Sequence, residues 1–272
     1  HDSMINAMKF WLTETDIDGF RCDVAGEVPR MFWQHAITEL KKVKPNLFML
    51  AEADVPWIHD AGFNVSYGWD GFAKMKKVAK GEASARVLDT VIRHIEETFP
   101  PNAAKMYFTS NHDENSWNKA DFQTMPGDVH APFAVLSQTW KNTVPLIYSG
   151  QEEPFLDSLS FFYKDTIVFG KYQRAAFYKT LLNLRKNTPA LAVDASYTKL
   201  ESSNDDAVFA FIREKEGSKV LVILNLSAQQ QSFTLKGAIA GEPQNVFAIK
   251  NEKLAEGQSI TLPAWGYLVY KY

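Results

Sequence analysis

Apolar positions along the first two thirds of the chain follow two spacings. Segments with an apolar residue every three to four positions have the period of an amphipathic helix, and short apolar runs separate these segments. The spacing predicts helices over residues 2–15, 29–44, 71–80, 84–98, 129–142 and 172–187. The short runs predict strands over residues 17–24, 46–51, 63–67, 105–110 and 144–149. This alternation is typical of a parallel α/β fold.

The pattern changes after about residue 195. Short apolar segments separated by turns predict strands over residues 208–213, 219–226, 230–235, 245–249, 259–262 and 266–270. Their spacing predicts a small antiparallel β-sandwich. We therefore expect two domains, an α/β domain over residues 1–193 and an all-β domain over residues 194–272.

Composition excludes several classes of protein. The 272 residues are 46% hydrophobic, which is enough for a buried core. No run approaches 18 apolar residues, so no membrane-spanning helix is predicted. A net charge of −3 without a basic run argues against a dedicated nucleic-acid binder. The single cysteine, Cys22, excludes an intrachain disulfide and a cysteine-rich zinc site.

The first predicted strand carries an arginine and a carboxylate on one face. Side chains alternate along a strand, so Arg21 and Asp23 point to the same side. A guanidinium close to a carboxylate keeps it ionised, which suits a nucleophile. The alternative is an ion pair with a purely structural role.

Two further strands end in polar residues. Glu52 follows Leu50 and lies among small apolar neighbours, an environment that suits a proton donor, although a solvated carboxylate at the rim is equally compatible. The fourth strand runs into six consecutive polar residues, among them His112 and Asp113. A histidine there would by default belong to a connecting loop.

The strand ends are expected to converge. In a parallel barrel the carboxyl ends of all strands open on one face, so Asp23, Glu52 and Asp113 would lie together. Glycoside hydrolases use converging carboxylates, and an arginine and a histidine beside them fit the same chemistry. They are also compatible with a Mg²⁺ or Ca²⁺ site, but Arg21 weighs against a cation beside Asp23.

In order along the chain, these residues resemble three signature regions of the α-amylase family, glycoside hydrolase family 13. The matching segments are Gly19-Phe20-Arg21-Cys22-Asp23-Val24-Ala25, Glu52 and Asn111-His112-Asp113. Gln151-Glu152 resembles the region after the last barrel strand of that family, and the all-β domain resembles its small C-terminal domain. The resemblance implies that Asp23 is the nucleophile, Glu52 the acid/base and Asp113 the third catalytic carboxylate. It implies that Arg21 and His112 contact the substrate.

The resemblance also predicts what the chain lacks. The family's first signature region is absent, and a full barrel needs about 250 residues. We therefore expect a partial (β/α)8 TIM barrel, about strands 4 to 8, whose chain begins in the helix before the fourth strand. Its expected protein partner is the missing N-terminal half of the barrel, or a second copy bound through the open edges. The calcium site of many members draws on the missing region, so no metal or cofactor is expected.

The predicted activity is retaining hydrolysis of α-glucosidic bonds in starch-like or malto-oligosaccharide substrates. Glucan transfer by the same residues and an inactive glucan-binding fragment are the alternatives. Gly26-Glu27 replaces a Lys-His pair of many starch-cleaving members, so the sites for the leaving part of the glucan are expected to differ. Trp57, Tyr67 and Trp69 are expected to stack on sugars, with Trp117 a further candidate; core packing is the alternative for each ring.

Overall fold

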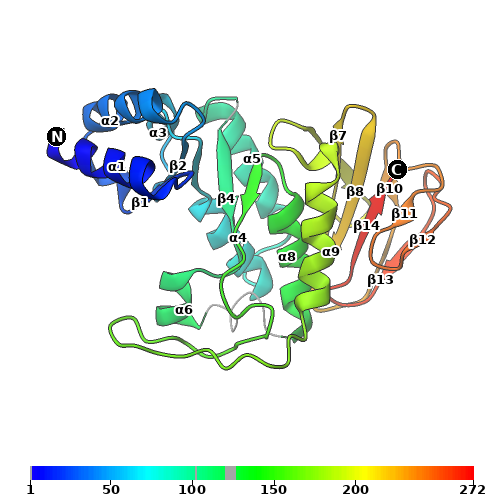
Figure 1. Cartoon of the computed structure of the whole chain (residues 1–272). Helices are drawn as coiled ribbons and strands as arrows, with labels where there is room; N and C mark the ends of the chain where they lie inside the picture. Colours follow the sequence, from blue (N-terminus) through cyan, green and yellow to red (C-terminus); the bar gives the residue numbers. More distant parts are fainter. Residues whose placement is uncertain (1, 102, 120–126) are drawn as a thin grey trace.

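The computed structural model describes residues 2–101, 103–119 and 127–272 (Figure 1). The α/β part comprises α1 (Asp2–Thr15), β1 (Gly19–Cys22), α2 (Arg30–Val43), β2 (Phe48–Ala51), α3 (Trp57–Asp60), β3 (Val65–Tyr67), α4 (Trp69–Ala79), α5 (Val87–Thr98), β4 (Ala104–Tyr107), α6 (His112–Asn118), α8 (His130–Thr139), β5 (Thr143–Pro145) and α9 (Ala175–Lys186). The all-β part comprises β6 (Ser196–Ser202), β7 (Val208–Lys215), β8 (Ser218–Asn225), β9 (Gln231–Phe233), β10 (Leu235–Lys236), β11 (Gln244–Asn245), β12 (Lys250–Asn251), β13 (Ile260–Leu262) and β14 (Tyr267–Lys271).

The first five strands form one parallel sheet. Their order is β1-β2-β3-β4-β5, and every neighbouring pair is parallel. A side chain at Gly19 could not be accommodated, because a Cβ there would lie 1.7 Å from the carbonyl oxygen of Phe48. Glycine thus permits the close approach of β1 to β2. Since every strand runs the same way, the residues that follow β1, β2 and β4 leave the sheet at the same edge.

The helices of the α/β part bury apolar stripes against this sheet. On α5 the buried residues are Leu88, Val91, Ile92 and Ile95, spaced as one helical face. On α2 the equivalent stripe includes Trp33, Ile37 and Leu40. No helix in the described ranges is long and apolar enough to cross a membrane.

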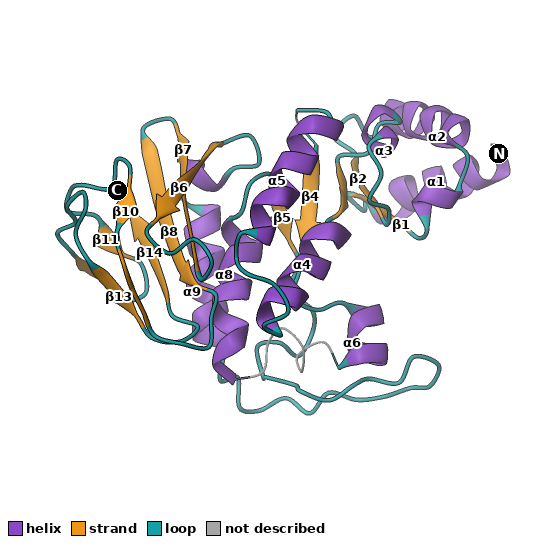
Figure 2. Cartoon of the chain, turned by 180° about the vertical axis from the view of Figure 1, so that it is seen from behind, coloured by secondary structure: helices purple, strands orange, loops and turns teal. Residues whose placement is uncertain are grey.

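A seven-stranded antiparallel sheet forms the C-terminal part. Its order is β10-β6-β7-β8-β14-β11-β12, and a two-stranded sheet of β9 and β13 lies beside it. One face buries Val208, Ile223 and their neighbours together with Phe233 and Leu262 of the small sheet. The other face joins the core of the α/β part, and Figure 2 shows the α8 and α9 helices on this side.

The predicted fold class is confirmed: a partial parallel α/β barrel is followed by an antiparallel β domain. The boundary between residues 193 and 194 and the partners of the open sheet edges stay predictions. The sequence pattern missed β6, whose residues are mostly polar, and it missed α6. The latter begins because the side chain of Asn111 accepts the Glu114 N–H at 2.8 Å and so caps a helix within the polar run.

Candidate active site

Arg21 lies between two carboxylates at the carboxyl edge of the parallel sheet. Its Nη1 donates to Asp23, and its Nη2 lies 3.1 Å from Glu52 Oε2. Its Nε donates to the Tyr67 hydroxyl at 3.1 Å. Arg21 of β1, the residues just after β1 and β2, and Tyr67 of β3 therefore meet at one guanidinium.

Glu52 also holds the backbone next to Asp23. The Glu52 carboxylate accepts the N–H of Val24 at 2.8 Å. Val24 has φ 43° and ψ 40°, a left-handed conformation that costs a β-branched residue about 1–3 kcal/mol. The backbone N–H of Glu52 donates to Cys22 O at 3.0 Å, and its carbonyl accepts from Ala25 N at 3.1 Å. Glu52 thus fixes the strained turn that presents Asp23.

The two carboxylates differ in exposure. The Asp23 side chain is 74% exposed, whereas that of Glu52 is 15% exposed. A hollow of about 460 Å³ lies beside Arg21 and Asp23. An approaching molecule can therefore reach Asp23 directly, and Glu52 is the more enclosed of the two.

Charge and hydrogen bonding keep Asp23 ionised. The hydrogen bond from Arg21 is the largest cause of a lowered Asp23 pKa. A hydrogen bond with Glu52 and the charge of His112 lower that pKa further. For Arg21, burial opposes the charge, but hydrogen bonds with Tyr67 and Asp23 outweigh it and the pKa is raised. The site is thus built around a carboxylate and a guanidinium that both stay charged.

Asp113 and His112 occupy the first turn of α6. His112 Nε2 lies 3.5 Å from Asp113 Oδ2. Burial raises the pKa of Tyr148, and the charge of Asp113 raises it further. The pKa of Tyr67 is also raised, chiefly by burial, with Asp113 among the contributing charges. The charge of Asp113 thus acts on Tyr67, the tyrosine that contacts Arg21.

The predicted aromatic platforms differ in environment. Tyr67 is 3% exposed and packs with ring centroids 5.4 Å from Trp69 and 5.8 Å from Phe108. Trp57 and Trp69 are partly buried. Trp117 on α6 is 63% exposed. Sugar stacking therefore stays a prediction, and the observed contact of Tyr67 at the site is with Arg21.

The sequence pattern did not predict a buried ion pair between Lys105 and Asp54. Lys105 of β4 is 1% exposed, and its Nζ lies 2.5 Å from Asp54 Oδ1 and 3.0 Å from Ser66 Oγ. Asp54 follows Glu52 by two residues, and its other oxygen accepts the Asp70 N–H at 3.0 Å. A lysine within the apolar run Lys105–Phe108 is the signal that was available.

Metal-ligating and nucleophilic side chains were compared next with the needs of a metal site and of a reactive thiol. In the part of the chain that the structure describes, no cluster of three or more His, Cys, Asp or Glu residues could hold a metal ion. Burial raises the pKa of the Cys22 thiol to about 12, so the thiol stays protonated.

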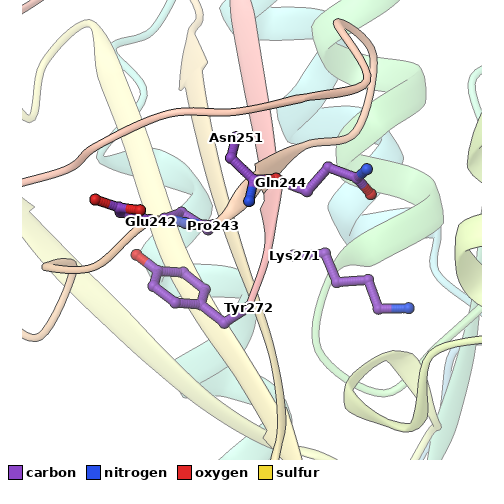
Figure 3. A pocket seen from close by; sticks show the side chains of 6 residues that line it. All are labelled: Glu242, Pro243, Gln244, Asn251, Lys271 and Tyr272. Atoms are coloured by element: carbon purple, nitrogen blue, oxygen red, sulfur yellow. The ribbon is translucent and has the colours of Figure 1, made fainter.

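A separate hollow of about 450 Å³ lies in the C-terminal sheet and is lined by Glu242, Pro243, Gln244, Asn251, Lys271 and Tyr272 (Figure 3). The ends of Lys271 and Gln244 point away from the Tyr272 ring. The Tyr272 hydroxyl donates to Ile239 O. This hollow lacks paired carboxylates and is not part of the group around Arg21.

Comparison with known proteins reveals relatives over nearly the whole chain. Residues 197–269 match the family model of the maltogenic amylase C-terminal domain. The α-amylase MalA of Haloarcula japonica is 28% identical over 235 residues, which cover 83% of this chain and 34% of that protein. The maltogenic α-amylase of Bacillus acidopullulyticus is 24% identical over 284 residues, covering 99% of this chain and 47% of that protein. The chain thus spans a third to a half of the length of these relatives.

A solved structure gives the same result. The crystal structure of the noncanonic maltogenic α-amylase AmyB from Thermotoga neapolitana matches with a TM-score of 0.87 and 25% identity. The match covers 100% of this chain and 65% of that chain. The predicted resemblance to the α-amylase family is confirmed by these findings.

Proposed function

We propose that this relative of the α-amylase family forms the C-terminal portion of a retaining glycosidase for α-glucans, with Asp23 as nucleophile and Glu52 as acid/base. The observation that carries the proposal is the contact of Arg21 with both carboxylates. Glycosidases of this type use two carboxyl groups, one to attack the sugar and one to transfer protons. In this proposal, residues 194–272 are the all-β C-terminal domain of the enzyme.

In the first step, Asp23 attacks the anomeric carbon and Glu52 donates its proton to the glycosidic oxygen. The carbon–oxygen bond to the leaving sugar breaks, and a glycosyl ester forms on Asp23. The exposure and the lowered pKa of Asp23 support its part, because an ionised and accessible carboxylate is the competent nucleophile.

In the second step, the ionised Glu52 takes a proton from water, and the water oxygen displaces Asp23 from the sugar. Ester formation has removed the negative charge of Asp23, so Arg21 then faces one carboxylate, that of Glu52.

Asp113 and His112 complete the proposed site. Positive charge develops on the sugar ring in the transition state, and a carboxylate near the ring stabilises it. Asp113 supplies this charge, and His112 binds a sugar hydroxyl. Tyr67 orients Arg21 through its hydroxyl. Malto-oligosaccharides are the proposed substrates, because the relatives described above are named as amylases.

The test separates the proton donor from the nucleophile. Glu52→Gln is expected to slow hydrolysis of maltoheptaose by several powers of ten, because its oxygen leaving group needs a proton. α-Glucosyl fluoride needs little protonation, so it should still form the ester, and azide should restore turnover by replacing the activated water. Glu201→Gln on β6 is the matched control, since this carboxylate lies in the C-terminal sheet and is exposed. Equal slowing of both substrates and no azide effect would contradict the role of Glu52.

A further inference from the structure

Gln151 is a buried polar residue that the proposed reaction does not use. It belongs to the Gln151-Glu152 segment that follows β5, and it is 3% exposed. Burying a side-chain amide is costly unless its oxygen and its nitrogen are hydrogen-bonded. The contacts of Gln151 therefore show what a glutamine at this position holds in place.

The Gln151 side chain joins three parts of the chain. Its Oε1 accepts the backbone N–H of Tyr148 at 2.6 Å. Because a backbone N–H can only donate, this contact fixes which end of the amide is the oxygen. The Nε2 group then donates to the hydroxyl of Thr109 at 2.9 Å and to that of Tyr178 at 2.8 Å. One buried amide thus connects the segment after β5 with the residues just after β4 and with helix α9.

The contact with Thr109 holds the chain just before the helix that carries Asp113. Thr109 is 2% exposed and lies two residues before Asn111, which is 0% exposed. The Asn111 side chain caps α6 by accepting the Glu114 N–H, and Asp113 lies in the first turn of that helix. Only four positions separate Thr109 from Asp113, so fixing Thr109 restricts where the Asp113 carboxylate can lie.

The contact with Tyr148 holds the opposite side of the same group. His112, Ser116 and Tyr148 line one hollow, so Tyr148 lies beside α6. Burial raises the pKa of Tyr148, and the charge of Asp113 raises it further, which agrees with this placement. Gln151 is therefore bonded to both segments that meet at Asp113.

The third contact of the amide continues into the protein core. The Tyr178 hydroxyl lies 3.0 Å from His130 Nε2, and both residues are 4% exposed. Burial and, to a smaller extent, the charge of Arg174 lower the pKa of His130 to about 3, so its ring is neutral at pH 7. The network thus runs without a charge from α8 through α9 to the residues around Asp113.

We propose that Gln151 is a positioning residue of the proposed catalytic site, and that it fixes the chain carrying Asp113 against the segment that follows β5. The inference rests on the proposed function, because it concerns how Asp113 is held for its part in the reaction. A carboxylate that stabilises the charge of a transition state acts only during bond breaking, and a small displacement of it lowers the rate. Binding of the substrate before the reaction changes little. In this role Gln151 acts through Asp113 and does not itself contact the sugar.

Steady-state kinetics of Gln151→Met test this role, since methionine has a similar length and cannot form the hydrogen bonds. We expect kcat for maltoheptaose to fall about tenfold, with KM changed less than about twofold. Thr109→Val removes one hydroxyl from the network and should lower kcat by a smaller factor, and it is the variant to measure if Gln151→Met does not fold. Gln138→Met is the matched control and should leave kcat unchanged. Gln138 on α8 is 1% exposed, and its amide has no hydrogen-bond partner in the part of the chain that the structure describes.

A double-mutant cycle separates positioning from general destabilisation. With α-glucosyl fluoride, a reactive substrate on which slow variants remain measurable, Gln151→Met should lower kcat/KM less than about twofold on the Asp113→Asn background, because the charge that it positions is already absent. The same tenfold loss on both backgrounds would overturn the positioning role, and so would an unchanged kcat in folded Gln151→Met and Thr109→Val proteins.

A crystal structure of the Gln151→Met protein keeps the two proposals distinguishable. If the protein does not hydrolyse α-glucans, the proposed function fails, and the position of Asp113 relative to Arg21 still tests the inference. A displaced Asp113 carboxylate supports the positioning role, whereas an unmoved one overturns it.

Discussion

Replacing Asp54 by Asn should destabilise the protein strongly, because the buried Lys105 ammonium loses the carboxylate that it contacts and is then expected to give up its proton on folding. The Lys105 ammonium is 1% exposed and contacts Asp54 Oδ1, Ser66 Oγ and the face of the Phe99 ring. Breaking a buried ion pair by removing one partner costs about 3–5 kcal/mol. Ser66 and the Phe99 ring remain but carry no negative charge, and the charge of Asp70 acts on Lys105 without a hydrogen bond between them, so we expect a loss in this range at pH 7.

The loss of unfolding free energy caused by Asp54→Asn should become smaller as the pH rises. Burial already lowers the pKa of Lys105, and Asp54 opposes that effect. Without Asp54 the folded state is expected to hold a neutral Lys105, whereas the unfolded chain keeps a lysine pKa of about 10.4. The unfolded state of the variant then binds one more proton than its folded state. The free energy of unfolding of the variant therefore rises by about 1.4 kcal/mol per pH unit, compared with a protein whose folded state keeps Lys105 protonated. The difference from wild type should therefore narrow between pH 7 and pH 9.

Urea unfolding at pH 7, 8 and 9 measures this effect. Asp60→Asn is the matched control: its ion pair with Arg30 is 3.4 Å long and about half exposed, so less than about 1 kcal/mol should be lost. A loss of unfolding free energy below about 1 kcal/mol for Asp54→Asn, or an equal loss at pH 7 and pH 9, would contradict a stabilising role for this ion pair.

Two further predictions concern buried cations and histidines. Arg213→Met should lower the free energy of unfolding by about 3–5 kcal/mol in urea titrations. The buried Arg213 guanidinium donates to five backbone carbonyls, including those of Thr139 and Trp140, and methionine cannot replace these hydrogen bonds. A loss below about 1 kcal/mol would contradict this prediction. Burial lowers the pKa of His130 to about 3, below its unfolded value of about 6.5, so the unfolded state binds more protons and stability falls as the pH drops between these values. His130→Gln should flatten that fall, and an unchanged pH profile would count against it.

The local pattern of the sequence predicted the parallel part of the fold and the face on which the site lies. Arg21, Asp23 and Glu52 follow from strand alternation and from the shared direction of parallel strands, and the structure brings these three together. Their catalytic roles stay proposals, supported by the resemblance rather than by strand geometry.

Other features depend on contacts that a local pattern does not contain. Asp113 lies in a helix that begins at the Asn111 cap. The residues of this helix are mostly polar, so they show no apolar period from which a helix could be predicted. Lys105 and Asp54 are 51 positions apart in the sequence, and only the folded sheet brings their side chains into contact. Tyr67 was placed at a strand end, but the pattern could not show that its ring packs beside Trp69 and Phe108.

Mass spectrometry of a trapped intermediate shows whether Asp23 forms a covalent bond with the sugar. The Glu52→Gln protein would be incubated with a fluorinated α-glucosyl fluoride, which forms the ester quickly and hydrolyses slowly, and then digested with pepsin. We expect a mass increase of one fluoroglucosyl group on the peptide that contains Asp23, and no increase in the Asp23→Asn variant. A label on another carboxylate, or no label in a protein that hydrolyses α-glucans, would contradict it.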